Sequence, residues 1–368
     1  MFKMGKHSSG FLAIVAILGL GLLFTGCGTA GKQDQTSSQA PKTFVVANWK
    51  GYGSDQSYAV QTFEKKYNVK VVHQYFNSEE ELLNMLRTGG VGKIDVVLPN
   101  LAYVQPAVKE GLIQPIDTSK LTNFQYLYKK LQNLPDVKGK DGQTYAVPWV
   151  WGTTSLAYNN KIIANKLDSW AALWDPQYKG KIAFFDDPTT AIMTAALYLG
   201  EDPYNPDLSK VKQALLQQKK LVKTYWSSAD DWTKLFTSNE IVVGNAWFGL
   251  SRLQISNGDP LTYVYPKEGA IGWVDNWAIV SNSPNKDLAY KWIDFMISEE
   301  FQKQYYEDPK AEAPAIANEK AVNDLDPKIK NAMPIDPKML DSLVMQGNLP
   351  TDTLKKWTAL WEEVKASS

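Results

Sequence analysis

The chain has 368 residues, of which 44% are hydrophobic and 21% are charged, a balance typical of a globular protein that divides into about two domains. Its 39 basic and 39 acidic residues cancel. Without residues 1–26, which contain Lys3 and Lys6, the count becomes 37 minus 39, or −2, and this excludes the basic surface that nucleic-acid binding requires.

The first residues resemble an export signal. Lys3 and Lys6 precede an apolar run that is too short and too rich in glycine for a confident membrane span, so we predict a signal peptide over residues 1–26. The run ends in Leu-Phe-Thr-Gly-Cys27, which resembles the bacterial lipobox, although Phe24 stands where leucine is usual. Lipidation of Cys27 would make it the mature N-terminus.

Cys27 is also the only cysteine, so no disulfide can form within the chain. Its alternative role is a reactive or buried thiol. The polar residues that follow cannot bury a core, and we predict that 27–42 comprise the lipidated cysteine and a flexible tether. The folded body would then meet the membrane through its lipid anchor only.

The body begins with alternating strand and helix patterns. We predict strands at 43–47, 69–74 and 94–100, and helices at 58–67 and 79–88, the second of them capped by Ser78. This βαβαβ order is typical of parallel sheets, which bind ligands at the carboxyl ends of their strands. Trp49, Tyr52 and Asn100 fall at those ends.

A later stretch, residues 266–279, contains Trp273 and Asp275 at alternate positions, so both side chains leave the same face of an extended segment. An indole attracts a cation over its face, and a carboxylate supplies the counter-charge. The alternative is a strand end with a buried tryptophan and a solvated aspartate. The pair indicates a site for an organic amine.

Eight segments resemble, in order and spacing, the spermidine/putrescine-binding proteins of bacterial polyamine ABC importers over about residues 43 to 310. These segments are NWKGY, IDVVLPNLAYV, EGLIQPIDTSKLTNF, YAVPWVWGTTSLAYN, SWAALWDPQYKGKIAFFDD, GNAWFGLS, YPKEGAIGWVDNWAI and NKDLAYKWIDFMI.

The resemblance implies an α/β, two-lobed type II periplasmic-binding-protein fold, in which each lobe is a mixed, mostly parallel sheet flanked by helices. It implies two hinge crossings, which we assign near 147–151 and 275–282. Lobe 1 would comprise residues 43–148 and 276–322, and lobe 2 residues 149–275 and 323–368. An amphipathic pattern at 286–298 predicts a helix of lobe 1, and a closing helix is expected around 354–364.

The resemblance also implies ligand contacts, carried over where motifs match: Trp49, Tyr52, Asn100, Asp187, Trp247, Trp273 and Asp275. Ser228, outside these motifs, is a candidate for an additional contact. Three positions depart from the family pattern, because Gly51 and Thr190 stand where acids are usual and Ala102 where an aromatic residue is usual.

Each contact has a structural alternative. Asp186 and Asp187 could cap a helix that begins at Pro188, where a carboxylate also complements the helix dipole. Trp247 could belong to the core. Trp170 and Trp174, at helical spacing, are expected in the core, and the alternative role of Trp149 and Trp151 is to pack the hinge.

Catalysis finds little support in the sequence. After the signal peptide the only histidine is His73, so His/Cys metal sites and Ser-His-Asp or Cys-His chemistry lack their residues. We expect no cofactor and no enzyme activity; the remote alternative is a glycosidase-like carboxylate pair among aromatic residues.

We therefore predict an extracytoplasmic, monomeric solute-binding lipoprotein that delivers a putrescine- or spermidine-like amine to an ABC permease and its ATPase. The alternative is the same fold with a zwitterionic ligand such as an amino acid, an opine or an aminobutyrate. Lys50 and Arg252 are the possible contacts for the carboxylate of such a ligand.

Overall fold

The computed structural model describes residues 41–332 and 339–367, which belong to one compact unit, Pro41–Ser368. The predicted signal peptide, Cys27 and nearly all of the tether lie outside the described residues. Within the described part, no helix has the length and apolar character needed to cross a bilayer. The fold is mixed α/β, as predicted, with one sheet whose main strands follow the order β2-β1-β3-β10-β5-β8-β6-β7.

The first part of the chain forms one flank of this sheet. β1 (Lys42–Asn48) lies between β2 (Val69–Tyr75) and β3 (Val96–Val97), and both pairings are parallel. Helices α1 (Ser57–Tyr67) and α2 (Glu79–Met85) connect them, and the Ser78 hydroxyl accepts a hydrogen bond from the Glu81 amide, as its predicted capping role requires.

The strand expected at 94–100 is much shorter than predicted. Only Val96–Val97 pair as β3, because the chain then turns into α3 (Leu101–Lys109). The Asn100 side chain accepts a hydrogen bond from the Ala102 amide and thereby caps this helix. A residue expected to follow a strand is thus also the N-terminal cap of a helix.

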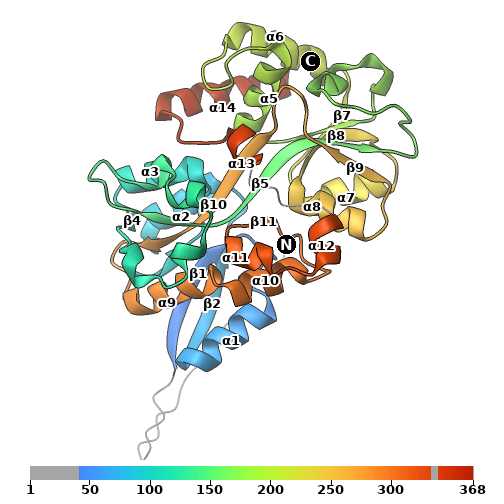
Figure 1. The fold of residues 1–368 in the computed structure, drawn as a ribbon. Coiled ribbons are helices and arrows are strands. Elements are labelled where there is room, and N and C mark those ends of the chain that lie inside the picture. Colours follow the sequence, from blue (N-terminus) through green and yellow to red (C-terminus); the bar gives the residue numbers. More distant parts are fainter. Residues whose placement is uncertain (1–40, 333–338, 368) are drawn as a thin grey trace, which may run out of the picture. The chain divides into compact units, whose positions relative to one another are not determined.

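Two long antiparallel strands, β5 (Ala146–Asn159) and β10 (Ile271–Val280), lie side by side along the sheet (Figure 1). The first half of β5 and the second half of β10 pack in one hydrophobic cluster with α1, α3 and α9 (Lys286–Met296). Leu156 of β5 and Ile271 of β10 pack in a second cluster. Both strands therefore pass from one core to the other.

The other flank is formed by the middle of the chain. It contains three parallel strands, β6 (Ile182–Phe185), β7 (Val222–Trp226) and β8 (Val243–Trp247). The helices that follow these strands in the chain are α5 (Pro188–Leu199), α6 (Leu208–Lys219), α7 (Ala229–Thr237) and α8 (Phe248–Ser256). β9 (Leu261–Val264) pairs with β5. Trp170 and Trp174 are buried in this second cluster, as expected.

The tail covers both clusters. α9 and α10 (Glu299–Glu307) pack on the first, and α14 (Thr351–Ala366) packs on the second through Trp357 and Trp361. Both predicted helices are confirmed, with α14 longer than expected. The remaining short elements are β4 (Ile113–Gln114), α4 (Lys129–Gln132), β11 (Ala315–Ile316), α11 (Glu319–Asn323), α12 (Pro327–Ala332), α13 (Met339–Ser342) and β12 (Val344–Met345).

Candidate ligand-binding pocket

A cavity of about 390 Å³ brings together residues that are far apart in the sequence. Its lining comes mainly from the ends of β1, β2, β6, β7 and β8, from Trp273 and Asp275 within β10, and from the first turns of the helices that follow strands. The predicted residues that line it are Trp49, Lys50, Tyr52, Asn100, Asp187, Ser228, Trp247, Trp273 and Asp275. The candidate site is therefore a single pocket.

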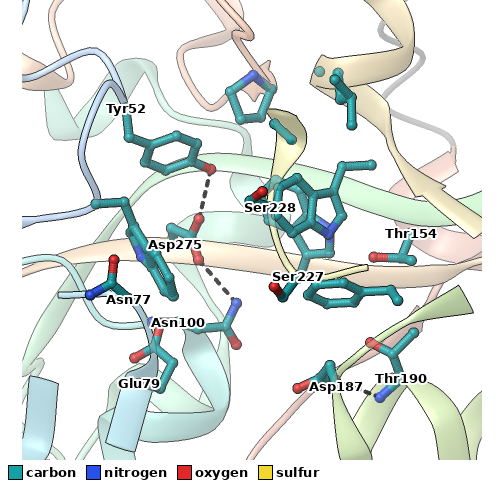
Figure 2. A pocket seen from close by; sticks show the side chains of 18 of the residues that line it. Tyr52, Asn77, Glu79, Asn100, Thr154, Asp187, Thr190, Ser227, Ser228 and Asp275 are labelled. Carbon is teal, nitrogen blue, oxygen red and sulfur yellow. Dashed lines mark hydrogen bonds between the residues drawn. The ribbon is translucent and has the colours of Figure 1, made fainter. Parts of the chain in front are cut away.

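Figure 2 shows Asp275 between Tyr52 and Asn100, joined to each by a hydrogen bond. The Tyr52 hydroxyl donates a hydrogen bond of 2.8 Å to one carboxylate oxygen, and the Asn100 amide donates one of 3.0 Å to the other. The pairing of β10 with β5 is irregular between Asp275 and Asn276, as expected of a bulge that redirects a side chain. Residues from three distant segments thus fix one carboxylate.

Burial controls the protonation of this group. Asp275 is only 7% exposed. Burial raises the pKa of its carboxyl from 3.8 to about 6, although the hydrogen bonds from Tyr52 and Asn100 act in the opposite direction. Burial also raises the pKa of the Tyr52 hydroxyl well above its usual value, with a further contribution from Asp275, so Tyr52 remains a donor at neutral pH. Both hydrogen-bond partners of this desolvated carboxylate, among the described residues, are neutral side chains.

Asp187 is a helix cap and a pocket residue at once. It precedes Pro188 at the start of α5, and one carboxylate oxygen accepts a hydrogen bond of 2.6 Å from the Thr190 amide. The predicted cap is therefore present, and Figure 2 shows the same side chain at the pocket beside Thr190. Burial raises the pKa of Asp187, which the hydrogen bonds with Thr190 partly oppose. Asp187 thus presents a second acid to the cavity.

Aromatic rings form much of the remaining wall. Trp49 packs edge-on against Phe76, with ring centroids 4.8 Å apart, and Trp247 packs against Phe185 at 5.0 Å. Trp273 crosses β5 at Gly152, where a β-carbon would lie 2.4 Å from the indole. Only glycine leaves room for this ring. The exposed ring faces can attract a cation.

The polar residues that line the pocket without having been predicted include Glu79, Glu312 and Gln346. Glu79 begins α2, and one of its oxygens accepts a hydrogen bond of 3.0 Å from the backbone N–H of Asn100. The other oxygen is buried and has no hydrogen-bond partner among the residues that the structure describes. Burial, and then Asp275, raise its pKa well above the usual value. The acidic first turn after Ser78 was a visible signal for Glu79, but Glu312 and Gln346 follow the part of the chain in which the family motifs are recognisable.

Ser228 lies at the pocket as the cap of α7, where its hydroxyl accepts a hydrogen bond from the Asp231 amide. Lys50 lines the cavity from an exposed position. Arg252 does not line it. The guanidinium of Arg252 lies 4.5 Å from the Tyr306 ring and donates to the Ala311 carbonyl, so the proposed carboxylate contact through Arg252 has no support in its position.

Several other side chains have structural roles. Asp186 accepts hydrogen bonds from Trp361 and Lys365 of α14 and does not line the pocket. Trp149 is fully buried and stacks on Tyr305, as a packing residue at the crossing strands would. His73 contacts the Ser54 hydroxyl at 3.3 Å. Among the described residues, no group of three or more His, Cys, Asp or Glu side chains could hold a metal ion.

Comparison with known proteins identifies the family. The model of the family described as "Bacterial extracellular solute-binding protein" matches residues 58–335. This chain belongs to that family. It is a solute-binding protein, and its relatives are binding proteins rather than enzymes.

The solute-binding protein is 32% identical to the "Spermidine/putrescine-binding periplasmic protein" of Escherichia coli (strain K12), over 86% of this chain and 87% of the relative. It is 28% identical to the "Putrescine-binding periplasmic protein PotF" of the same organism, over 71% of this chain and 75% of that protein. The resemblance found in the sequence is thereby confirmed.

A solved structure described as a "Putative spermidine/putrescine ABC transporter from Listeria monocytogenes" superposes with a TM-score of 0.77 at 27% identity. The superposition covers 88% of the solute-binding protein and 99% of the other chain. The predicted type II periplasmic-binding-protein fold is thus confirmed.

Proposed function

We propose that this protein is the polyamine receptor of an ABC importer, and that it binds a putrescine- or spermidine-like cation in the pocket around Asp275. The observation that carries the proposal is the charge of that pocket. Among the described lining residues, the carboxylates are Glu79, Asp187, Asp275 and Glu312, whereas the single cation is the exposed Lys50. A buried carboxylate without a counter-charge is costly, and an ammonium ligand would supply that charge.

The chemistry of the wall suits an alkyl polyamine. The tryptophan rings offer cation-π contacts to ammonium groups and apolar surface to the methylenes between them. The carboxylates of Asp187 and Asp275 would each pair with one ammonium group. Relatives named as spermidine- or putrescine-binding proteins support this ligand class.

A zwitterionic ligand would need a cation to hold its carboxylate. Arg252 is engaged by Tyr306 and Ala311, which leaves Lys50 as the pocket cation in the described part of the chain. The pocket therefore favours polyamines over amino acids, opines and aminobutyrate.

We further propose that the body is two lobes joined by β5 and β10, which close over the ligand. For lobe 1 we keep the boundaries predicted from the sequence, residues 43–148 and 276–322. Leu325 and Leu340 also pack in the first hydrophobic cluster, so we assign the final return to lobe 2 after Leu340 rather than at residue 323. Contacts available only in the closed form would stabilise closure.

The closed form would be delivered, by a monomer, to the permease and ATPase of the importer. Lipidation at Cys27 would hold the protein at the outer face of the cell membrane, in the periplasm if the cell has one. These assignments depend on the sequence of the N-terminal region and on the family, whose described members are extracellular or periplasmic.

Titration calorimetry of the purified protein with putrescine, spermidine and 4-aminobutyrate tests the ligand class. We expect saturable binding of at least one polyamine and none of 4-aminobutyrate at the same concentration. A protein that ignores both polyamines, or prefers 4-aminobutyrate, would overturn the proposal.

A further inference from the structure

Glu312 is an acidic residue of the pocket to which the proposed function assigns no ligand contact. It lies between α10 and β11, lines the cavity and is partly buried. Its carboxylate makes no hydrogen bond or ion pair with any residue in the part of the chain that the structure describes. Glu312 thus differs from Asp275, which two donors hold, and from Asp187, which caps a helix.

The backbone around Glu312 is fixed, although its carboxylate is not. A β-carbon at Gly249 would lie 2.3 Å from the Glu312 carbonyl oxygen, so α8 packs directly on this segment. Arg252, from the same helix, donates a hydrogen bond of 2.9 Å to the Ala311 carbonyl. Arg252 therefore holds the peptide next to Glu312 without pairing with its carboxylate, and the side chain remains available to a ligand.

Within residues 41–332 and 339–367, no cation compensates the charge of Glu312. Burial raises the pKa of its carboxyl, and Asp230 raises it further. Both effects disfavour the ionised form, and a neighbouring ammonium group would reverse them. Glu312 therefore has the character of a cation subsite that is incomplete without its ligand.

We propose that Glu312 binds a third ammonium group, so that the pocket takes a linear triamine in preference to a diamine. This inference rests on the proposed polyamine-binding function and assigns the ligand's nitrogens to three acids that line one cavity, Asp187, Asp275 and Glu312. A diamine would pair with two of these acids and leave the third desolvated. Spermidine would neutralise all three.

The test compares Glu312→Gln with wild type by calorimetry, using spermidine and putrescine as the probes. Glutamine preserves the shape of the side chain and removes its charge. We expect wild type to bind spermidine more tightly than putrescine. We expect the variant to lose about 10- to 100-fold in affinity for spermidine and less than about threefold for putrescine, the scale of one charged contact.

Asp308→Asn is the matched control, because it removes one negative charge from the same segment outside the pocket lining. Asparagine can still accept the hydrogen bond from the Lys310 amide, and this variant should bind both amines as wild type does. Glu312→Asp should retain part of the preference for spermidine, since it keeps a shorter carboxylate.

The outcomes separate this inference from the proposed function. Suppose that wild type binds polyamines, but that Glu312→Gln lowers the affinity for spermidine and for putrescine equally, or lowers neither affinity. The triamine subsite is then refuted, and the proposed polyamine receptor stands. A wild-type preference for putrescine also refutes the subsite. If wild type binds neither amine, both proposals fail. Urea unfolding of each variant verifies that a lost affinity is not lost folding.

Discussion

Replacement of Asp275 by asparagine should affect stability and binding in opposite directions. The Asp275 carboxyl has a folded-state pKa of about 6 against its ordinary 3.8. Because the pKa is raised on folding, its contribution to stability is fully present below pH 3.8 and is lost as the pH rises through 6. The difference of about 2.2 corresponds to about 3 kcal/mol.

Asparagine removes this ionisation cost and can keep both hydrogen bonds. Its amide oxygen can accept from Asn100, and its NH₂ group can donate to the Tyr52 oxygen. Without ligand at pH 7, we therefore expect Asp275→Asn to raise the free energy of unfolding by up to about 3 kcal/mol. At pH 4 the difference should fall below about 1 kcal/mol, since wild-type Asp275 is then protonated in the folded state.

The same substitution should weaken polyamine binding by about 2 to 5 kcal/mol, the usual result of removing one partner of a buried charged pair. In wild type, the bound ammonium lowers the pKa of Asp275, so binding releases protons below about pH 7. Polyamine affinity should therefore rise as the pH increases through 6 and level off above it.

Urea unfolding at pH 4 and pH 7, followed by calorimetry with putrescine and spermidine, measures both effects. Asp141→Asn is the control: Asp141 is exposed, and hydrogen bonds led by that from the Gln143 amide lower its pKa, so its loss should not stabilise the protein. An Asp275→Asn variant that is less stable than wild type at pH 7, or equally stabilised at pH 4, would refute the desolvation argument. Unchanged polyamine affinity would refute the ligand contact.

Three further predictions concern other parts of the chain. Gly152→Ala should displace the Trp273 indole, because the added methyl group would overlap the ring. We expect polyamine affinity to fall by about tenfold and the free energy of unfolding to fall by about 1 to 3 kcal/mol. Unchanged binding by calorimetry would contradict this prediction. Cys27→Ser should prevent lipidation, so incorporation of labelled fatty acid into that variant would rule out the lipobox interpretation. If the lobes close by rotation at β5 and β10, saturating ligand should reduce the radius of gyration without changing the circular dichroism of the backbone, and superimposable scattering curves would exclude closure.

Local patterns were sufficient for much of the fold. The periodicity of apolar residues predicted α1, α9 and α14, and a serine before an acidic turn predicted the cap of α2. These signals are readable because capping and amphipathicity depend on residues within a few positions of each other. The alternation of Trp273 with Asp275 likewise predicted that both would leave one face, and both line the pocket.

Family motifs also predicted pocket residues that show no periodic spacing in the sequence. They brought Trp49, Asn100 and Asp187 into one predicted site, and the structure places all three at one cavity. Sequence proximity, rather than a motif, suggested Arg252 as a carboxylate contact, and the position of this side chain gives that prediction no support. Arg252, five residues after Trp247, is on α8 and is directed toward Tyr306 and Ala311, because successive turns of a helix expose different faces.

The tertiary structure alone decided which acids complete the pocket. Glu79 and Glu312 belong to segments separated by more than half the chain, and they share a cavity only because helices α2 and α8 and the tail are packed around the two long strands. The raised pKa of Asp275 is also a tertiary property, since desolvation depends on every group that excludes water from the carboxylate. Sequence determines which side chains can carry charge, whereas folding determines which of those charges remain without a partner until a ligand arrives.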